Sequence, residues 1–319
     1  MWLANGLGRL ALPGEGCVAT IGNFDGVHRG HQAVIENLAV QGRRLGLPVV
    51  VVLFEPQPRE YFCPERSPPR LTRCREKLFQ LSALPVDGVL LLRFDRALAD
   101  CPPEDFIREV LVEGLRVKHL VVGDDFHFGK DRRGNFGMLK AFGAACGFAV
   151  ADTGSVRVDG ERVSSTLVRA ALAAGGMAEA ATLLGRPYSV IGRVCHGRKL
   201  GRQLGFPTAN IAMMRKKTPL QGVFAVTMTG ISALPLPGVA NVGIRPTVDG
   251  RSLAQLETHL FDFAGDLYGR LVEVHFHHKL RDEQRFADVQ ALRGQIDRDA
   301  GQARAYFAHL YPPHSANRI

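Results

Sequence analysis

The chain has 319 residues, of which 46% are hydrophobic and 22% are charged, as is typical of a soluble globular protein with a buried core. This length favours two domains. No apolar run reaches the length of a membrane span, and the N-terminus lacks the basic-then-apolar pattern of a signal peptide, so we expect a cytoplasmic protein with no membrane partner. The six cysteines include no C-x-x-C pair, which argues against a zinc site and against a disulfide framework.

The formal net charge of +9, from 40 basic and 31 acidic residues, suits anionic partners. Several basic residues lie within glycine-rich segments, which favours nucleotides as those partners. No recognition-helix pattern, zinc-finger spacing or long basic tract indicates a nucleic-acid partner, so we expect none. The oligomeric state stays unknown at this stage.

In chain order, the first half alternates between buried strands and amphipathic helices. Strands are expected at residues 17–21, 48–54, 88–94 and 119–123, with helices at 32–39, 74–84 and 103–114. This alternation predicts a doubly wound α/β domain with a parallel sheet, in which ligands bind at the carboxyl ends of the strands. One further helix is expected from residue 166 to about 184.

The segment Gly185-Arg186-Pro187 ends that helix, and we place a domain boundary there, between domains at residues 1–185 and 186–312. Beyond it, alternating strands at 188–194, 222–228 and 270–276 follow one another without helices between them. They predict an antiparallel β-barrel. Apolar spacing predicts a terminal helix over residues 285–310, packed on the barrel.

The first candidate site follows the first strand, in the stretch Ile21 to His31. Glycines let backbone come close to a ligand, and a strand-to-helix turn favours a phosphate through its free N–H groups and the helix dipole. His28 and His31 are three residues apart, so both face one side of the helix start. Imidazoles aimed at phosphate oxygens can stabilise a pentavalent transition state. We assign these two histidines to catalysis, and Gly22, Asn23, Phe24, Asp25 and Gly26 to ATP binding.

Two loops at later strand ends have both a structural and a functional interpretation. The segment Glu55 to Phe62 either lines a pocket or is a plain exit loop, and we assign Gln57 no role in proton transfer. In Gly123 to Gly129, acidic residues between aromatics either bind ribose or magnesium or cap the loop.

The second candidate site is the glycine-rich stretch Gly192 to Asn210. Its glycines allow the backbone to wrap phosphates, and the side-chain oxygens of Thr208 and Asn210 suit Mg²⁺. The stretch is not a Walker loop, because G-x-x-x-x-G-K-(S/T) does not occur there.

Both stretches resemble those of the bacterial bifunctional riboflavin kinase/FMN adenylyltransferase (FAD synthetase) family. GNFDGVHRGHQ resembles its N-terminal module, which carries the nucleotidylyltransferase signature His-x-Gly-His, and GRKLGRQLGFPTAN resembles the riboflavin kinase signature. The resemblance covers about residues 17 to 300. It implies phosphorylation of riboflavin to FMN, then adenylylation of FMN to FAD, with ATP and Mg²⁺ in both steps.

The resemblance also implies further site residues. ATP-binding residues would be Asp125, Ser164, Ser165, Thr166 and Arg169 in the first module, and Gly201, Arg202, Gly205, Phe206, Pro207, Thr208 and Asn210 in the second. Flavin-binding residues would be Asn241, Arg245, Arg281 and Glu283. A kinase that acts on an alcohol needs a base, and Glu257 is the candidate.

Two other functions remain open from the sequence alone. A cytidylyltransferase or a pantetheine-phosphate-type adenylyltransferase would share His-x-Gly-His but would leave the second module unexplained. A basic nucleic-acid or flavin-responsive regulator with degenerate sites would bind RNA or DNA in a salt-dependent way and would not turn over ATP.

Overall fold

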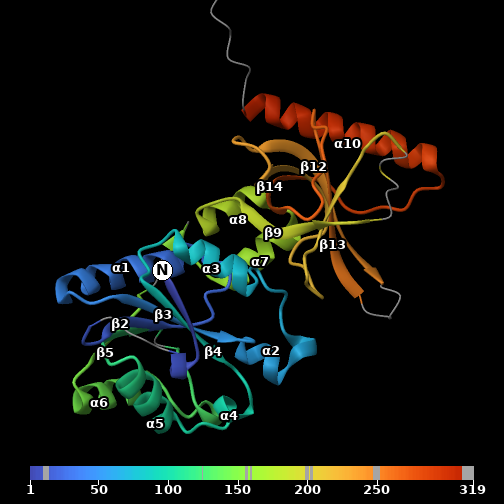
Figure 1. The fold of residues 1–319 in the computed structure, drawn as a ribbon. Helices are drawn as coiled ribbons and strands as arrows, with labels where there is room; N and C mark the ends of the chain where they lie inside the picture. The colour runs from blue at the N-terminus through green and yellow to red at the C-terminus, as the bar shows by residue number, and fades with distance from the viewer. Residues whose placement is uncertain are drawn as a thin grey trace, which may run out of the picture. The chain divides into compact units, whose positions relative to one another are not determined.

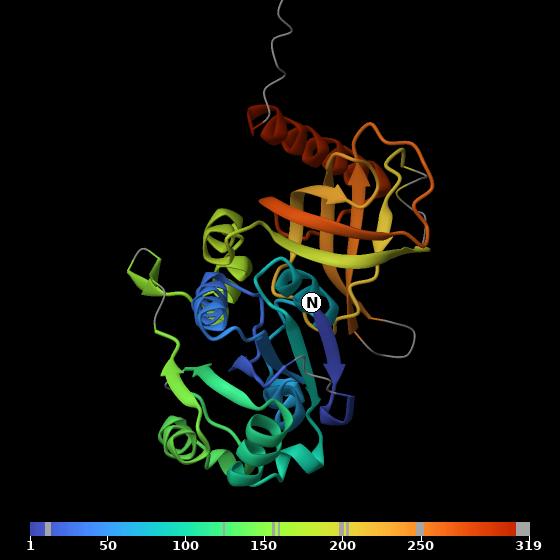
Figure 2. The same cartoon turned by 60° about the vertical axis from the view of Figure 1, so that its left-hand side comes forward.

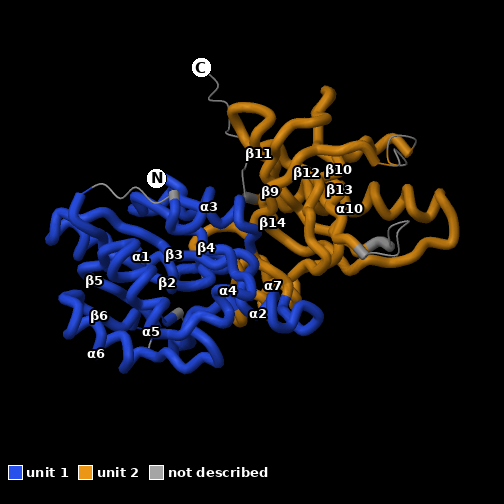
Figure 3. The backbone as a smooth tube through the Cα atoms, turned by 60° about the horizontal axis from the view of Figure 1, so that its bottom comes forward, with its two compact units in different colours: residues 1–68, 72–165 blue, residues 69–71, 166–319 orange. Residues whose placement is uncertain are grey.

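The computed structural model describes residues 1–9, 14–123, 125–154, 157–158, 160–197, 201, 204–246 and 252–310. The chain divides into two compact units (Figure 3). Unit 1 consists of Met1–Pro68 and Thr72–Ser165, and unit 2 of Pro69–Leu71 and Thr166–Ile319. Within the described ranges, no helix is both long enough and apolar enough to cross a membrane.

Unit 1 is built on a six-stranded sheet with the strand order β1-β4-β3-β2-β5-β6. Every pair of neighbouring strands is parallel, which confirms the predicted doubly wound sheet. The strands are β1 (Trp2–Asn5), β2 (Cys17–Ile21), β3 (Val49–Glu55), β4 (Gly88–Arg93), β5 (Val117–Val122) and β6 (Ala149–Asp152). The sequence analysis missed β1, a short edge strand on β4 whose four residues carry no alternating pattern.

Helices cover both faces of this sheet, with α1 and α3 on one side and α4, α5 and α6 on the other (Figure 1). The helices of unit 1 are α1 (Arg29–Leu45), α2 (Pro58–Phe62), α3 (Cys74–Ser82), α4 (Arg96–Ala99), α5 (Pro103–Phe106), which continues as a π-helix at Ile107–Gly114, and α6 (Phe136–Cys146). Short 3₁₀ helices lie at Leu7–Arg9, Pro64–Arg66 and Lys130–Arg132, and β7 (Arg157–Val158) pairs with β8 (Glu161–Arg162).

The continuous apolar run of β3 fits this two-sided cover. Val50, Val52 and Phe54 pack with the side of the sheet that meets Phe106 and Leu139. The residues between them in the strand, such as Val51 and Leu53, pack with Ile35 of α1 and Leu81 of α3 instead. Both faces of the strand are therefore buried, as a parallel sheet requires.

The order of the strands reverses direction beside β2. From β2 the chain proceeds to β3 and β4 on one side, and then returns to β5 on the other side of β2. The loops that follow β2 and β5 thus leave the sheet edge in divergent directions, and such a switch point is where open α/β sheets bind ligands.

Unit 2 contains a closed six-stranded barrel with the strand order β10-β13-β12-β11-β14-β9 (Figures 1 and 2). All neighbouring strands are antiparallel, which confirms the predicted barrel. The strands are β9 (Tyr188–Cys195), β10 (Ala209–Ile211), β11 (Gly222–Thr229), β12 (Leu236–Pro246), β13 (Ser252–Leu260) and β14 (Leu271–Arg281). The sequence Asp249-Gly250 between β12 and β13 is typical of a turn, and it lies outside the described residues.

The single helix expected from residue 166 to 184 is wrong, because the structure has α7 (Ser165–Ala174) and α8 (Met177–Leu184). Gly175 has φ = 82°, a left-handed conformation that ends a helix. Its N–H donates to Leu172 O at 3.1 Å, and the N–H of Gly176 donates to Ala171 O at 2.8 Å. The sequence analysis predicted one continuous helix because the segment is rich in alanine, and it did not treat this pair of glycines as a helix end.

The terminal helix α10 (Val289–Leu310) packs on the barrel as predicted, although it starts four residues later than expected. Asp288 sets the start, since its Oδ1 accepts from the Ala291 N–H at 2.8 Å. Ala300, Ala303 and Phe307 of the helix bury against Val223, Ala225, Val239 and Phe261. Figures 1 and 2 show α10 in red, lying across the strands.

Histidines of β14 complete the packing of α10. His277 meets Phe307 edge-on, with ring centroids 5.6 Å apart, and its Nε2 lies 2.9 Å from Thr227 Oγ1. Burial, together with the nearby His275, lowers the pKa of His277 below its usual 6.5. Below pH 6.5 the unfolded chain binds a proton at this imidazole more readily than the native barrel does. His277 therefore lowers the free energy of unfolding as the pH falls.

We expect the melting temperature of the barrel transition to drop between pH 7.5 and 5.5, and to drop less in His277→Gln. The amide can keep a hydrogen bond to Thr227 but cannot titrate. Differential scanning calorimetry at the two pH values measures both drops. His309→Gln is the matched control, since this histidine is exposed near the end of α10. Equal drops in the wild type and His277→Gln would contradict the assignment.

Candidate active sites

The first site is the loop between β2 and α1, at the switch point of the unit 1 sheet. The loop turns sharply: Phe24, Gly26 and Val27 have φ angles of 46°, 87° and 43°. Two of these residues are not glycines, so other groups must hold the backbone in this conformation. At its end, His28 is the N-cap of α1, with its Nδ1 3.4 Å from the N–H of His31 as acceptor.

A buried hydrogen-bond cluster holds the loop. Asp25 Oδ1 accepts from the Thr72 N–H at 2.9 Å and from the Thr72 hydroxyl at 3.2 Å, and that hydroxyl accepts from the Gly26 N–H at 2.9 Å. Asp25 and Thr72 are 3% and 1% exposed. Ser165 also donates from its hydroxyl to Asp25 O at 2.9 Å. In this structure, Asp25 Oδ1 serves to shape the loop.

The rings of His28 and His31 stack face to face, with centroids 3.6 Å apart and an interplanar angle of 17°. Phe24 lies against His31 at 4.7 Å. Burial, His28 and Lys77 hold the pKa of His31 well below its usual 6.5, so this imidazole is neutral near pH 7. Because His28 Nδ1 accepts a hydrogen bond, the neutral form of that ring carries its proton on Nε2.

Gly30 lies between the two histidines, where space for a side chain is limited. A Cβ at this position would lie 3.1 Å from His28 Nδ1 and 3.4 Å from the Val163 carbonyl oxygen. The first distance is tighter than ordinary van der Waals contact, so a larger residue would require the His28 ring to shift by a few tenths of an ångström. The glycine of His-x-Gly-His therefore has a steric role in this chain.

The other residues predicted to bind ATP in the first module are divided between the two units. Asp125 is exposed in the loop after β5, the strand that pairs with β2. Ser164 and Ser165 belong to unit 1, whereas Thr166 and Arg169 belong to unit 2. Arg169 donates from Nε to Pro69 O at 2.7 Å, within unit 2. The shared role of these residues in binding ATP stays a prediction.

The second site is a row of polar side chains on the barrel. Asn210 of β10 and Asn241 of β12 are each paired directly with Glu257 of the intervening strand β13. Directly opposed residues of antiparallel strands project from the same face. The structure thus brings together a predicted base, a predicted metal ligand and a predicted flavin ligand, from three separate motifs.

The remaining flavin-binding candidates lie at one end of this row. Asn241 donates from Nδ2 to Glu283 Oε1 at 3.1 Å, so Glu283 extends the row. Arg281 instead binds Asp299 of α10 with two nitrogens, Nε at 3.0 Å and Nη2 at 2.7 Å from its two oxygens. The side chain of Arg245 and all of Arg202 lie outside the described residues.

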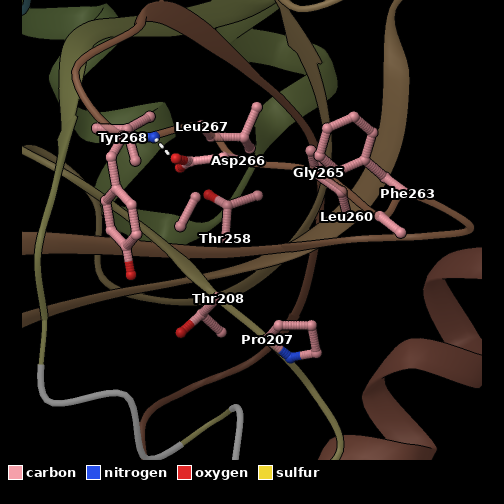
Figure 4. A pocket seen from close by; sticks show the side chains of 12 residues that line it. Pro207, Thr208, Thr258, Leu260, Phe263, Gly265, Asp266, Leu267 and Tyr268 are labelled. Carbon is pink, nitrogen blue, oxygen red and sulfur yellow. Dashed lines mark hydrogen bonds between the residues drawn. The ribbon is translucent and has the colours of Figure 1, made fainter.

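A pocket of about 760 Å³ lies in unit 2, a volume suited to a nucleotide. Pro207 and Thr208 line one side of it, and the loop from Phe263 to Tyr268 lines another (Figure 4). The Asp266 carboxylate shapes that loop by accepting from the Tyr268 N–H at 2.9 Å. The Thr258 hydroxyl is buried in the pocket wall and has no hydrogen-bond partner among the described residues. Sequence analysis missed Thr258, which has no local motif of its own.

Two glycines leave space for the proposed metal ligands. A Cβ on Gly197 would overlap the side chain of Asn210, and one on Gly201 would lie 3.2 Å from Thr208 Oγ1. The backbone therefore approaches both side chains closely, and their neutral oxygens fit a hard cation that is also held by phosphates. Within the described ranges, no group of three or more His, Cys, Asp or Glu residues could hold a metal ion by itself.

Removal of the Thr72 hydroxyl should loosen the first site. In Thr72→Val, the buried Gly26 N–H loses its acceptor, which costs about 1–3 kcal/mol. We expect amide exchange at residues 24–28 to accelerate by about tenfold or more, since 1.4 kcal/mol corresponds to a factor of ten. Hydrogen–deuterium exchange measures this, and Thr72→Ser, which keeps the hydroxyl, should exchange like the wild type. Unchanged exchange in Thr72→Val would contradict the cluster's role.

Comparisons with known proteins match both halves of the chain. A family model described as FAD synthetase matches residues 12–167, and one described as riboflavin kinase matches residues 184–307. The bifunctional riboflavin kinase/FMN adenylyltransferase of Escherichia coli K12 is 51% identical over 313 residues, covering 98% of this chain and 100% of the relative. The protein of the same name from Pseudomonas fluorescens is 52% identical over 308 residues, covering 97% and 98%.

Among solved structures, a crystal structure described as a macrolide-efflux protein from Streptococcus pneumoniae has a TM-score of 0.79 and 29% identity. The match covers 95% of this chain and 98% of that one, so the fold is alike over nearly the whole length. With two family models in order along the chain, and relatives of about half-identical sequence over nearly its full length, the chain belongs to the bifunctional riboflavin kinase/FMN adenylyltransferase family.

Proposed function

We propose that the two activities of this family are divided between two modules, FMN adenylyltransferase at residues 1–185 and riboflavin kinase at residues 186–312. The chain is an enzyme that phosphorylates riboflavin to FMN and then adenylylates FMN to FAD. ATP is the co-substrate. The division between modules, the residue roles and the metal are proposals. The cytoplasmic location and the absence of a nucleic-acid partner stay predictions.

In the adenylyltransferase module, the phosphate of FMN attacks the α-phosphorus of ATP. The bond from that phosphorus to the bridging oxygen breaks, and pyrophosphate leaves. The attacking phosphate is already largely ionised near pH 7, so the step needs no general base. His28 and His31 donate hydrogen bonds to the oxygens on which charge develops. The loop from Gly22 to Gly26 and the start of α1 contribute backbone N–H groups.

In the kinase module, the terminal hydroxyl of riboflavin attacks the γ-phosphorus of ATP, and ADP leaves. The hydroxyl must lose its proton as the bond to phosphorus forms, and Glu257 accepts it. Asn241 and Glu283 hold the flavin beside this carboxylate, and the pocket between Thr208 and Tyr268 holds the nucleotide. The observation that supports this proposal most strongly is the register that aligns Asn210, Glu257 and Asn241 across three strands.

Mg²⁺ bound with ATP would neutralise phosphate charge in both modules. In the kinase module, Thr208 Oγ1 and Asn210 Oδ1 would hold it, since the lack of a Cβ at Gly197 and Gly201 leaves these side chains room beside the loop. Thr208, Asn210 and the backbone around Gly201 and Gly205 then orient the nucleotide toward Glu257.

Variants of one module should lose the activity of that module and keep the other activity. The double variant His28→Ala/His31→Ala should lose FAD formation by at least about 10²-fold while FMN formation persists, because each donor at a developing charge contributes about that much. Glu257→Gln should lose FMN formation while FAD formation from supplied FMN persists. Chromatography of the flavins made from riboflavin or FMN with ATP and Mg²⁺ measures both.

Matched controls are available in each unit. His119→Ala changes a histidine in the first half of β5, away from the carboxyl ends of the strands, and Asp297→Asn removes an exposed carboxylate of α10. Both controls should keep the two activities. Loss of both activities in a folded His28→Ala/His31→Ala variant would refute the division between modules, and a wild type that makes neither flavin would refute the function.

Chelation tests whether both activities require a divalent metal ion. Excess EDTA should abolish both activities, and added Mg²⁺ should restore them. In Asn210→Ala, FMN formation should require a higher Mg²⁺ concentration for half-maximal rate, whereas FAD formation from FMN should keep its wild-type requirement. Titration of each rate with Mg²⁺ at fixed ATP measures this. An unchanged requirement for FMN formation in Asn210→Ala would remove this residue from the metal site.

A further inference from the structure

Lys77 of α3 is among the largest of the fully buried side chains that the structure describes, with 1% of it exposed. A lysine is almost never buried to this extent unless its ammonium has strong partners, because removing the charge from water costs several kcal/mol. No motif in the sequence singled out this residue. The proposed chemistry of unit 1 also leaves it unused.

The ammonium of Lys77 reaches the first site directly. Its Nζ donates a hydrogen bond to the carbonyl oxygen of Asn23, in the loop between β2 and α1. Asn23 immediately precedes Phe24, where the backbone turns to φ = 46°. A charged donor makes stronger hydrogen bonds than a neutral one, so Lys77 fixes the loop at the start of its strained turn.

The positive charge of Lys77 also acts on His31. Two positively charged groups side by side disfavour each other, and the pKa of His31 is lowered by burial, by His28 and by Lys77. The groups around the His31 ring are His28, stacked at 3.6 Å, Phe24 at 4.7 Å and this ammonium. The nearby carboxylate of Asp25 is held by Thr72.

We propose that Lys77 is a positioning residue for adenylyl transfer: its ammonium holds the Asn23–Val27 turn that leads into the stacked pair of His28 and His31. The inference rests on the proposed function of this loop. In this arrangement Lys77 contributes a positive charge that disfavours protonation of His31, so His31 acts as a neutral hydrogen-bond donor.

The neighbouring residue offers a matched comparison. Glu76 is also 1% exposed, but its Oε2 accepts from the Arg73 N–H at 2.6 Å, where it caps the start of α3. Two adjacent buried charges on one helix thus make different contacts, one within the helix and one in the loop of the active site. Glu76→Gln perturbs the same helix without removing the charge beside His31.

The test compares pH profiles of FAD formation from FMN. In Lys77→Met, kcat should fall by about 10²-fold, as for loss of one preorganised electrostatic contact. The acid limb of its pH profile should move to higher pH, because His31 protonates more readily without the ammonium. Lys77→Arg and Glu76→Gln should keep the acid limb in its wild-type position. FMN formation should keep its wild-type rate in all three variants, which controls for folding of unit 2.

A purely structural role for Lys77 would lower activity without moving the acid limb, and that result overturns the proposal. If Lys77→Met does not fold, Lys77→Gln takes its place, since it lacks the charge but keeps a hydrogen-bond donor. In NMR titrations the His31 ring should protonate at higher pH in this variant than in the wild type, and equal titrations overturn the proposal. A wild type that forms no FAD overturns the proposed function instead, and the comparison of the two ring titrations still tests the effect of Lys77 on His31.

Discussion

The turn from Asn23 to Val27 is the constraint on which the first site depends. Phe24 and Val27 adopt positive φ angles that cost about 1–3 kcal/mol each when nothing compensates them. The compensation comes from buried groups distant in sequence: Thr72 binds Asp25 and Gly26, and Lys77 binds Asn23. The turn then delivers His28 and His31 to the start of α1 as a stacked pair. Geometry that is costly for the loop alone is thus stabilised by the hydrogen bonds of the folded unit.

The barrel positions its functional side chains in a different way. Phosphate chemistry in unit 1 uses backbone N–H groups and a helix start, whereas in unit 2 the functional side chains stand on neighbouring antiparallel strands. Register alone places Asn210, Glu257 and Asn241 in one row. The difference follows the chemistry proposed for each module, since an alcohol nucleophile needs a carboxylate base and an ionised phosphate does not. A one-residue slip of β13 would turn Glu257 to the opposite face.

The C-terminal helix is tied to this row through the end of β14. Arg281 forms a bidentate pair with Asp299 of α10, which is 2% exposed, and Gln295 donates to the same carboxylate at 2.9 Å. Two residues further along the chain, Glu283 accepts from Asn241. Breaking a buried ion pair by removing one partner is costly, so α10 and the strand end stay in place together. Packing of a terminal helix therefore supports the end of the proposed flavin site.

Local sequence determined much of this protein. Several features follow from backbone periodicity or from steric limits that act over a few residues. They are the apolar run of β3, the alternation of β9, β11 and β14, and the spacing of His28, Gly30 and His31. They were sufficient to predict a parallel sheet, an antiparallel barrel and the two motifs. Tertiary structure alone decided the partnership of Thr72 with Asp25, the contact of Lys77 with Asn23, and the alignment of Glu257 with two asparagines. These features join residues far apart in the chain, and the free energy that selects such contacts comes from burial and hydrogen bonding in the completed fold, which no short stretch of sequence contains.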